Sequence, residues 1–188
     1  MKRCWALLAY LLPCSAAAAA EPPREQSSAA APEPKSPEPV GSVSLAALVG
    51  YGFAGPGWPD DTNHFGVGYG VAAGYVFPSN VYLGGTLVRY LGVSGDTSQY
   101  DAYTLDFDVG AEFDVGPVSL RPSLGLGALL AVFSNSEGGN SALRPQLTPA
   151  LLAQVPIGVV RVGAEARCAL VTEYPGSLFL LGSAGVEF

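Results

Sequence analysis

The chain has 188 residues, of which 49% are hydrophobic and only 13% are charged, whereas soluble domains carry about 25% charged residues. The 9 Lys and Arg residues face 16 Asp and Glu residues, so the net charge is −7. This balance excludes a nucleic-acid binder, which needs a basic patch. The apolar content excludes disorder of the whole chain. After residue 20, no apolar run of about 20 residues could form a membrane-spanning helix.

The first twenty residues have the pattern of a signal peptide. Lys2 and Arg3 form a positive start, and the apolar stretch 5–12 follows. Ala18 and Ala20 supply the small residues of a cleavage site. We therefore expect cleavage after Ala20, and with it export of the protein.

Two alternatives use the same N-terminal residues. A membrane anchor would have to span the bilayer with about eight apolar residues before Pro13, which is short. A lipoprotein signal would use Cys14, but Pro13 before it fits that motif poorly. The next segment, 21–40, holds six prolines, four glutamates and no aromatic residue. This composition predicts a disordered linker, and 41–188 is then the folded part.

The folded part alternates between apolar and small or polar residues. In 103–115 (YTLDFDVGAEFDV) every second residue is apolar, which is the period of a β-strand and not of a helix. The alternation predicts eight strands, at 43–53, 65–76, 81–91, 103–115, 118–133, 143–155, 159–171 and 178–188. The segment 81–91 alternates least clearly. There we assign Tyr82, Val88 and Tyr90 to the apolar face, opposite Leu83, Leu87 and Arg89.

The connections between the predicted strands alternate in length. Short turns are expected at 78–80, 116–117 and 156–158, and longer loops at 54–64, 92–101, 134–142 and 172–177. Short turns at one end and long loops at the other are typical of eight-stranded antiparallel up-and-down transmembrane β-barrels. Both ends of the folded part then lie on the short-turn side.

A soluble barrel of the lipocalin type would bury the apolar face instead. The interior of eight strands is too narrow for that face, and the other face lacks lysine and is rich in glycine. Aromatic residues also fall near the strand ends, as in the girdles of membrane barrels. We expect Tyr51, Phe53, Phe65, Tyr90 and Tyr103 on the long-loop side, and Tyr75, Tyr82, Phe113 and Phe188 on the short-turn side.

With this pattern, 41–188 resembles the small eight-stranded outer-membrane β-barrels of the OmpA/OmpX type. The last strand also ends in Phe188, with Val186 and Leu180 at even steps before it. This resembles the signal read by the barrel-assembly machinery. The resemblance implies the outer membrane of a Gram-negative bacterium, a periplasmic linker and C-terminus, and a monomer. The implied partners are outer-membrane lipid and lipopolysaccharide, and the assembly machinery during biogenesis.

The face opposite the apolar one carries charges of both signs. We predict a charge network in the lumen, formed by Arg89, Asp106, Asp108, Glu112, Asp114, Arg121, Arg161, Glu165, Arg167 and Glu187. One interpretation is a selective pore or proton path. We favour the other, a plug of paired charges, because a buried charge needs a partner and arginine pairs well with carboxylates.

The sequence predicts no catalytic, cofactor-binding or metal-binding residue. A lipid-modifying enzyme would need a constellation such as histidine with serine, and the single histidine, His64, is distant in sequence from Ser94, Ser98, Ser134 and Ser136. The loops are acidic, through Asp60, Asp61, Asp96, Asp101, Glu137 and Glu173, and carry Trp58, Tyr100 and Tyr174. We expect a structural or surface-interaction role, with a narrow pore for small solutes or ions as the alternative.

Overall fold

A computed structural model describes residues 40–55, 64–92, 98–135, 138–171 and 176–188. The expected signal peptide and almost all of the expected linker lie outside these residues. Within the described residues, no helix is long and apolar enough to cross a membrane.

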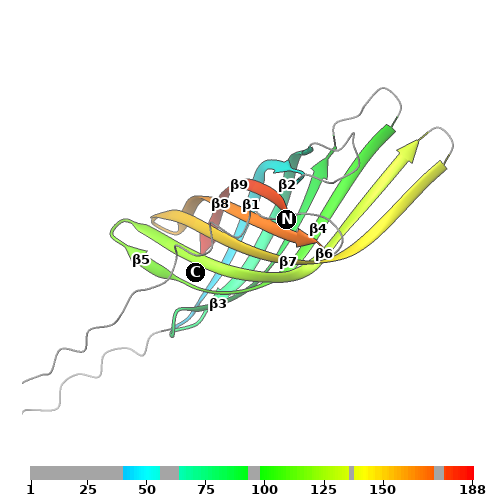
Figure 1. The fold of residues 1–188 in the computed structure, drawn as a ribbon. Coiled ribbons are helices and arrows are strands. Elements are labelled where there is room, and N and C mark those ends of the chain that lie inside the picture. Colours follow the sequence, from blue (N-terminus) through cyan, green and yellow to red (C-terminus); the bar gives the residue numbers. More distant parts are fainter. Residues whose placement is uncertain (1–39, 56–63, 93–97, 136–137, 172–175) are drawn as a thin grey trace, which may run out of the picture. The chain divides into compact units, whose positions relative to one another are not determined.

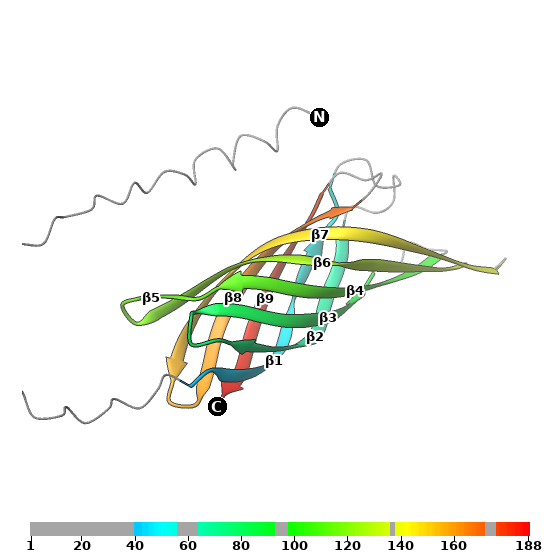
Figure 2. The ribbon, with the colours of Figure 1, turned by 90° about the horizontal axis from the view of Figure 1, so that it is seen from below.

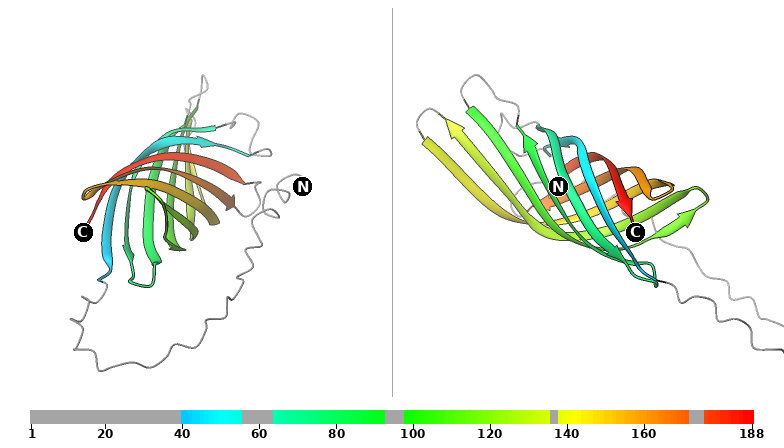
Figure 3. Two further views of the ribbon diagram at one scale, coloured as in Figure 1. Left: turned by 90° about the vertical axis from the view of Figure 1, so that its left-hand side faces the viewer. Right: turned by 180° about the vertical axis from the view of Figure 1, so that it is seen from behind.

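The described residues form one antiparallel sheet that closes on itself (Figures 1 and 3). Strands that are consecutive in the chain pair with each other, except β4 and β5. β1 pairs with β9, and β4 pairs with both β3 and β6. The strands are β1 Ser42–Phe53, β2 His64–Val76, β3 Val81–Leu91, β4 Ser98–Ala111, β5 Phe113–Val115, β6 Val118–Asn135, β7 Gly138–Ile157, β8 Val160–Val171 and β9 Ser177–Glu187.

β4 and β5 are two parts of one barrel strand. Both pair with β6 in a single register, with Gly110 opposite Ser123 in β4 and Phe113 opposite Leu120 in β5. Two residues of β6 lie between these pairs, Arg121 and Pro122, and Pro122 has no N–H to donate to the ladder. The predicted eight-stranded up-and-down barrel is therefore confirmed.

Tight turns join the strands at one end, which we call the short-turn end. Gly116 and Gly158 have positive φ values of 63° and 65° at the first central position of their hairpins. A type II′ turn places glycine at this position. The turn between β7 and β8 lies at 158–159, whereas the prediction placed it at 156–158. The difference arises because β7 continues to Ile157. The opposite end of the barrel is the long-loop end.

The apolar face points outward along the strands, as predicted. On β1, Leu45 and Val49 are 52% and 60% exposed, and on β6 Leu126 is 65% exposed. The alternate residues face the lumen and are buried or half-buried. An outer surface this apolar suits a lipid environment.

The structure corrects the predicted faces of β3. Tyr82, Val88 and Tyr90 point into the lumen and are at most 5% exposed, whereas Leu87 and Arg89 point outward. Val88 and Tyr90 lie opposite glycines of β2, at Gly70 and Gly68. These glycines leave room in the lumen for both side chains, so the inner face of β3 can carry Val88 and Tyr90.

Phe65 also points inward, against the prediction. The pairing of β1 with β2 shifts by one residue, since Gly52 faces Gly66 but Phe53 faces His64. Gly66 has a φ of 79°, which is common for glycine in a bulge. The extra residue reverses the alternation, and Phe65 is fully buried in the lumen. Phe65, Tyr82 and Tyr90 therefore belong to the interior and not to the aromatic girdles.

Two of the predicted long loops are partly strand. β6 and β7 pair as far as Asn135 and Gly138, and β4 begins at Ser98 opposite Asn135. By contrast, β3 ends opposite Asp101 and β8 ends opposite Gln146. β4, β6 and β7 thus continue past their neighbours, as Figures 1 and 2 show. We call residues 98–100, 133–135 and 138–145 the sheet extension.

Candidate functional site: the lumen of the barrel

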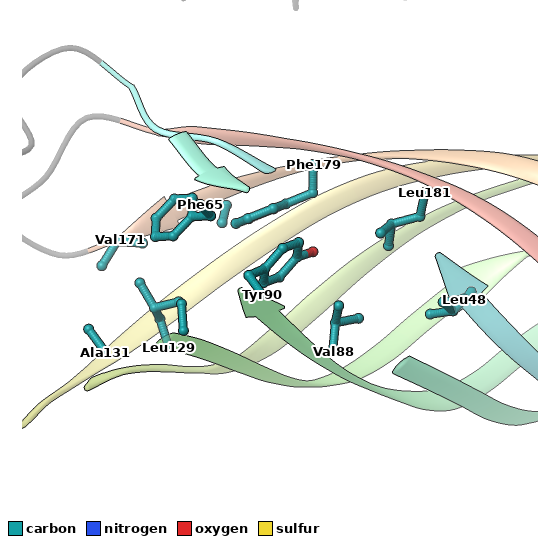
Figure 4. Packing of buried hydrophobic residues seen from close by; sticks show 11 residues of the cluster. Leu48, Phe65, Val88, Tyr90, Leu129, Ala131, Val171, Phe179 and Leu181 are labelled. Carbon is teal, nitrogen blue, oxygen red and sulfur yellow. The ribbon is translucent and has the colours of Figure 1, made fainter. Parts of the chain in front are cut away.

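The long-loop half of the lumen is filled by apolar side chains. Phe65, Tyr90 and Phe179, from β2, β3 and β9, bring their rings together (Figure 4). The ring centroids of Tyr90 and Phe179 are 4.7 Å apart, and those of Phe65 and Phe179 are 5.4 Å apart. We call these three residues the aromatic plug. Around it lie Leu48, Val88, Ala102, Leu129, Ala131, Ala169, Val171 and Leu181.

Glycines on neighbouring strands make room for this plug. A Cβ atom at Gly68 would lie 2.5 Å from Cδ1 of Tyr90, and one at Gly52 would lie 2.8 Å from Cδ1 of Phe179. Real Cβ atoms do not approach other atoms so closely. Glycine at these positions therefore follows from the size of the rings and not only from the narrowness of the barrel.

On the short-turn side of the aromatic plug lies a set of buried charges that we call the Arg167 layer. It consists of Arg167, Asp106, Asp108 and Glu165. The Arg167 guanidinium contacts all three carboxylates, at 3.1 Å from Asp106, 2.6 Å from Asp108 and 2.9 Å from Glu165. Its side chain is only 3% exposed.

Neutral side chains add further hydrogen bonds to the Arg167 layer. Gln146 Nε2 and Thr148 Oγ1 donate to Asp106 Oδ1 at 2.8 and 3.1 Å. Thr86 Oγ1 donates to Asp108 Oδ2 at 2.8 Å. Strands β3, β4, β7 and β8 are thereby connected across the lumen, which fixes the spacing of the barrel walls.

A second set of charges lies nearer the short-turn end, and we call it the Arg161 layer: Arg161, Arg121, Glu112 and Glu187. Arg121 Nε donates to Glu112 Oε2 at 2.9 Å, and its terminal nitrogen contacts the same oxygen. Arg161 donates to Glu112 at 3.0 Å and to Glu187 at 2.7 Å. Two guanidinium groups thus meet two carboxylates.

A small cavity borders both layers. Its volume is about 50 Å³, and its lining includes Asp108, Arg121, Gln154, Arg161, Glu165 and Arg167. One water needs roughly 10–15 Å³, so the cavity has room for a few waters and not for a larger solute.

Eight of the ten residues predicted for the lumenal charge network lie in these two layers. Arg89 does not: it lies on the outer face of β3, where it pairs with Asp101 at 2.8 Å. Tyr69 and Tyr103 flank it, with the Arg89 guanidinium 5.5 Å from the Tyr103 ring centroid. Asp114 is exposed on β5, outside the layers. Asp101, which was expected in an acidic loop, is instead part of strand β4, where it pairs with Leu91 of β3.

The other candidate residues can be placed only in part. His64, Ser98, Tyr100 and Ser134 begin or extend strands, and their side chains are outside the described part of the structure. The described residues also exclude Trp58, Asp60, Asp61, Ser94, Asp96, Ser136, Glu137, Glu173 and Tyr174. Phe188, the predicted assembly signal, is 73% exposed and its backbone pairs with Val43 of β1.

Comparison with known proteins rests on structure alone, since no family model and no curated protein matches the chain. Neisserial surface protein A is similar with a TM-score of 0.60 at 15% identity, over 79% of this chain and 97% of that one. Ail, the attachment invasion locus protein of Yersinia pestis, has a TM-score of 0.57 at 20% identity over the same shares. The N-terminal β-barrel domain of OprF from Pseudomonas aeruginosa has 0.52 at 16%, over 78% and 97%.

The fold is that of the OmpA/OmpX-type outer-membrane barrels. The fold predicted from the alternation is thereby confirmed. What the sequence reasoning missed in its lumen is the aromatic plug. A signal for it was present, because Leu48, Leu129, Phe179 and Leu181 are large apolar residues at positions of the otherwise small and polar face.

Proposed function

We propose that the protein resides in the outer membrane as a closed barrel, with a structural role and a surface for interaction at its long-loop end. The observation that carries this proposal is the filling of the lumen. The aromatic plug closes one half, and two layers of paired charges cross the other half. A solute would have to displace buried rings and break buried ion pairs, which argues against the alternative of a narrow pore.

The position of Arg89 and Asp101 marks the end of the apolar band on the long-loop side. Among the outward-facing residues of the described strands, these two carry the charges. The aromatic residues Tyr69 and Tyr103 lie beside them, as expected at a membrane interface. The sheet extension then lies beyond the apolar band, outside the membrane. The short-turn end, with Val40 and Phe188, faces the periplasm.

Thiol labelling of intact cells tests this orientation. Leu143 in the sheet extension and Ile157 at the short-turn end are matched positions, 68% and 64% exposed. We expect a membrane-impermeant thiol reagent to label Leu143→Cys and not Ile157→Cys, both in a Cys168→Ser background. Labelling of Ile157→Cys alone would show that the short-turn end, and not the long-loop end, faces the outside of the cell.

Two further measurements test the barrel and its closure. The mature protein should fractionate with the outer membrane and migrate faster on a gel when it is not heated. In planar bilayers it should give no steady conductance. Stable open channels would favour the pore.

An interaction role is supported by the sheet extension, whose β7 residues 138–145 lie beyond the pairing with β8. Such an edge exposes backbone N–H and C=O groups that can pair with another chain. One structure of Ail holds the heparin analogue sucrose octasulfate. We do not extend that ligand to this chain, because a net charge of −7 disfavours a polyanion.

A further inference from the structure

The two charged layers of the lumen differ in their balance. In the Arg161 layer two guanidinium groups face two carboxylates. In the Arg167 layer a single guanidinium faces the three carboxylates of Asp106, Asp108 and Glu165. If all three carboxylates were ionised, this layer would carry two uncompensated negative charges.

Neighbouring groups do not compensate this excess. From β3 the layer faces the neutral side chains Tyr82, Thr86 and Tyr90, and from β7 it faces Gln146 and Thr148. Arg121 of β6 and Arg161 of β8 line the adjoining cavity, and both are engaged by Glu112. Arg144 of β7 is on the same face as Gln146, two residues nearer the long-loop end. On β1 and β9, Ser44 and Ser183 line the adjoining cavity, and Glu187 of β9 is paired with Arg161.

Burial makes the excess negative charge of the Arg167 layer energetically unfavourable. The side chains of Asp106 and Asp108 are each 2% exposed. Carboxylates that share a buried site repel each other strongly enough that one of them retains a proton. The proton then belongs to the coupled group and not to one residue alone.

The hydrogen bonds show where a proton fits. Asp106 accepts at both oxygens, from Gln146 and Thr148 at Oδ1 and from Arg167 at Oδ2. Asp108 accepts from Thr86 and Arg167 at Oδ2 only. Its Oδ1 atom is buried and has no hydrogen-bond partner among the residues that the structure describes, and Asp108 borders the cavity. A proton on this oxygen would displace no donor.

A metal cation fits the same place less well. The adjoining cavity is lined by the guanidinium groups of Arg121, Arg161 and Arg167, which repel a second cation at short range. We propose that the Arg167 layer is a proton-binding site, which holds one proton shared among Asp106, Asp108 and Glu165 at neutral pH. The proton comes from water, and a carboxyl O–H bond forms.

Binding of this proton makes the stability of the barrel depend on pH. In the unfolded chain all three carboxyl groups are ionised at neutral pH, so the folded barrel binds one proton more. Stability then falls as pH rises, and the unfolding equilibrium constant increases about tenfold for each pH unit. The slope ends at the pH where the folded barrel itself releases the proton.

Infrared spectroscopy of the refolded barrel tests the site directly. We expect the carbonyl stretch of a protonated carboxylic acid at neutral pH in the wild type. The Asp108→Asn and Glu165→Gln variants should each lose it, because removal of one negative charge removes the need for the proton. Asp101→Asn, which removes a carboxylate paired with Arg89 on the outer face of the barrel, should keep it. Absence of the band from the wild type would overturn the proposal, as would its persistence in both Arg167-layer variants.

Urea unfolding at several pH values gives a second readout. Between mildly acidic and mildly alkaline pH, the wild type should lose stability and Asp108→Asn should change much less. The series should be repeated with sodium exchanged for choline at constant ionic strength. An equal pH slope in both proteins would overturn the proposal, and so would a wild type stabilised specifically by sodium, because a metal cation would then fill the site.

Discussion

Arg121 lies over the ring of Tyr82 inside the barrel, with its guanidinium carbon 4.0 Å from the ring centroid. The same arginine is held by Glu112 on the other side. Tyr82 is 5% exposed, so this cation–π contact is shielded from water, where it is stronger than at a surface. The ring thus positions the cation of the Arg161 layer, although Tyr82 was expected at the membrane interface.

Replacing Tyr82 tests this contact. We expect Tyr82→Leu to destabilise the barrel by about 2 kcal/mol, because the arginine loses its stacked ring. Tyr82→Phe keeps the ring and should cost less than half of that. Urea unfolding of the protein refolded in detergent measures both. Equal losses in the two variants would show that the hydroxyl group matters and the stacking does not.

Removing the central cation should be far more damaging. Arg167→Met leaves three buried carboxylates without their partner, and we expect a loss of about 3–5 kcal/mol at neutral pH. Arg89→Met removes an ion pair whose side chains are 39% and 35% exposed, and should cost less than about 1 kcal/mol. The fraction of heat-modifiable protein after refolding, followed by urea titration, compares the two variants. A small effect of Arg167→Met would contradict the assigned contacts.

Substitution of glycines tests whether they make room for the aromatic plug. We expect Gly68→Val to destabilise the barrel by about 1–3 kcal/mol through overpacking against Tyr90. In a Tyr90→Ala background, Gly68→Val should cost less than it does in the wild type, because the ring that the valine would meet is gone. Gly85→Val is the matched control, because a Cβ atom there meets its nearest neighbour at an ordinary 3.5 Å. If both glycine variants lose the same stability, the loss reflects strand glycine in general.

The role of Phe188 as an assembly signal is a prediction about biogenesis. Phe188→Asp should lower the amount of protein that reaches the outer membrane, while refolding of the purified chain stays near wild type. Phe113→Asp serves as control, since Phe113 is also an exposed aromatic residue at the short-turn end. Fractionation of cells expressing each variant measures the effect. An equal defect in both variants would point to the loss of an apolar surface residue, not to a signal.

Much of the barrel was determined by the order of residues alone. A period of two over short segments separates apolar from small and polar faces, and lipid outside a narrow lumen then decides which face points outward. The eight strands, the turns at 116–117 and 78–80, and eight members of the charge network follow from this pattern.

The tertiary structure decided the rest, because alternation distinguishes two faces but not which neighbours they meet. β3 has large side chains on both faces, and its orientation depends on the glycines of β2 opposite Val88 and Tyr90. The bulge that turns Phe65 inward is a property of the pairing between β1 and β2. Only closure of the sheet brings Phe179 to Tyr90, and Asp106 and Asp108 to Arg167, because these residues lie on strands far apart in the chain.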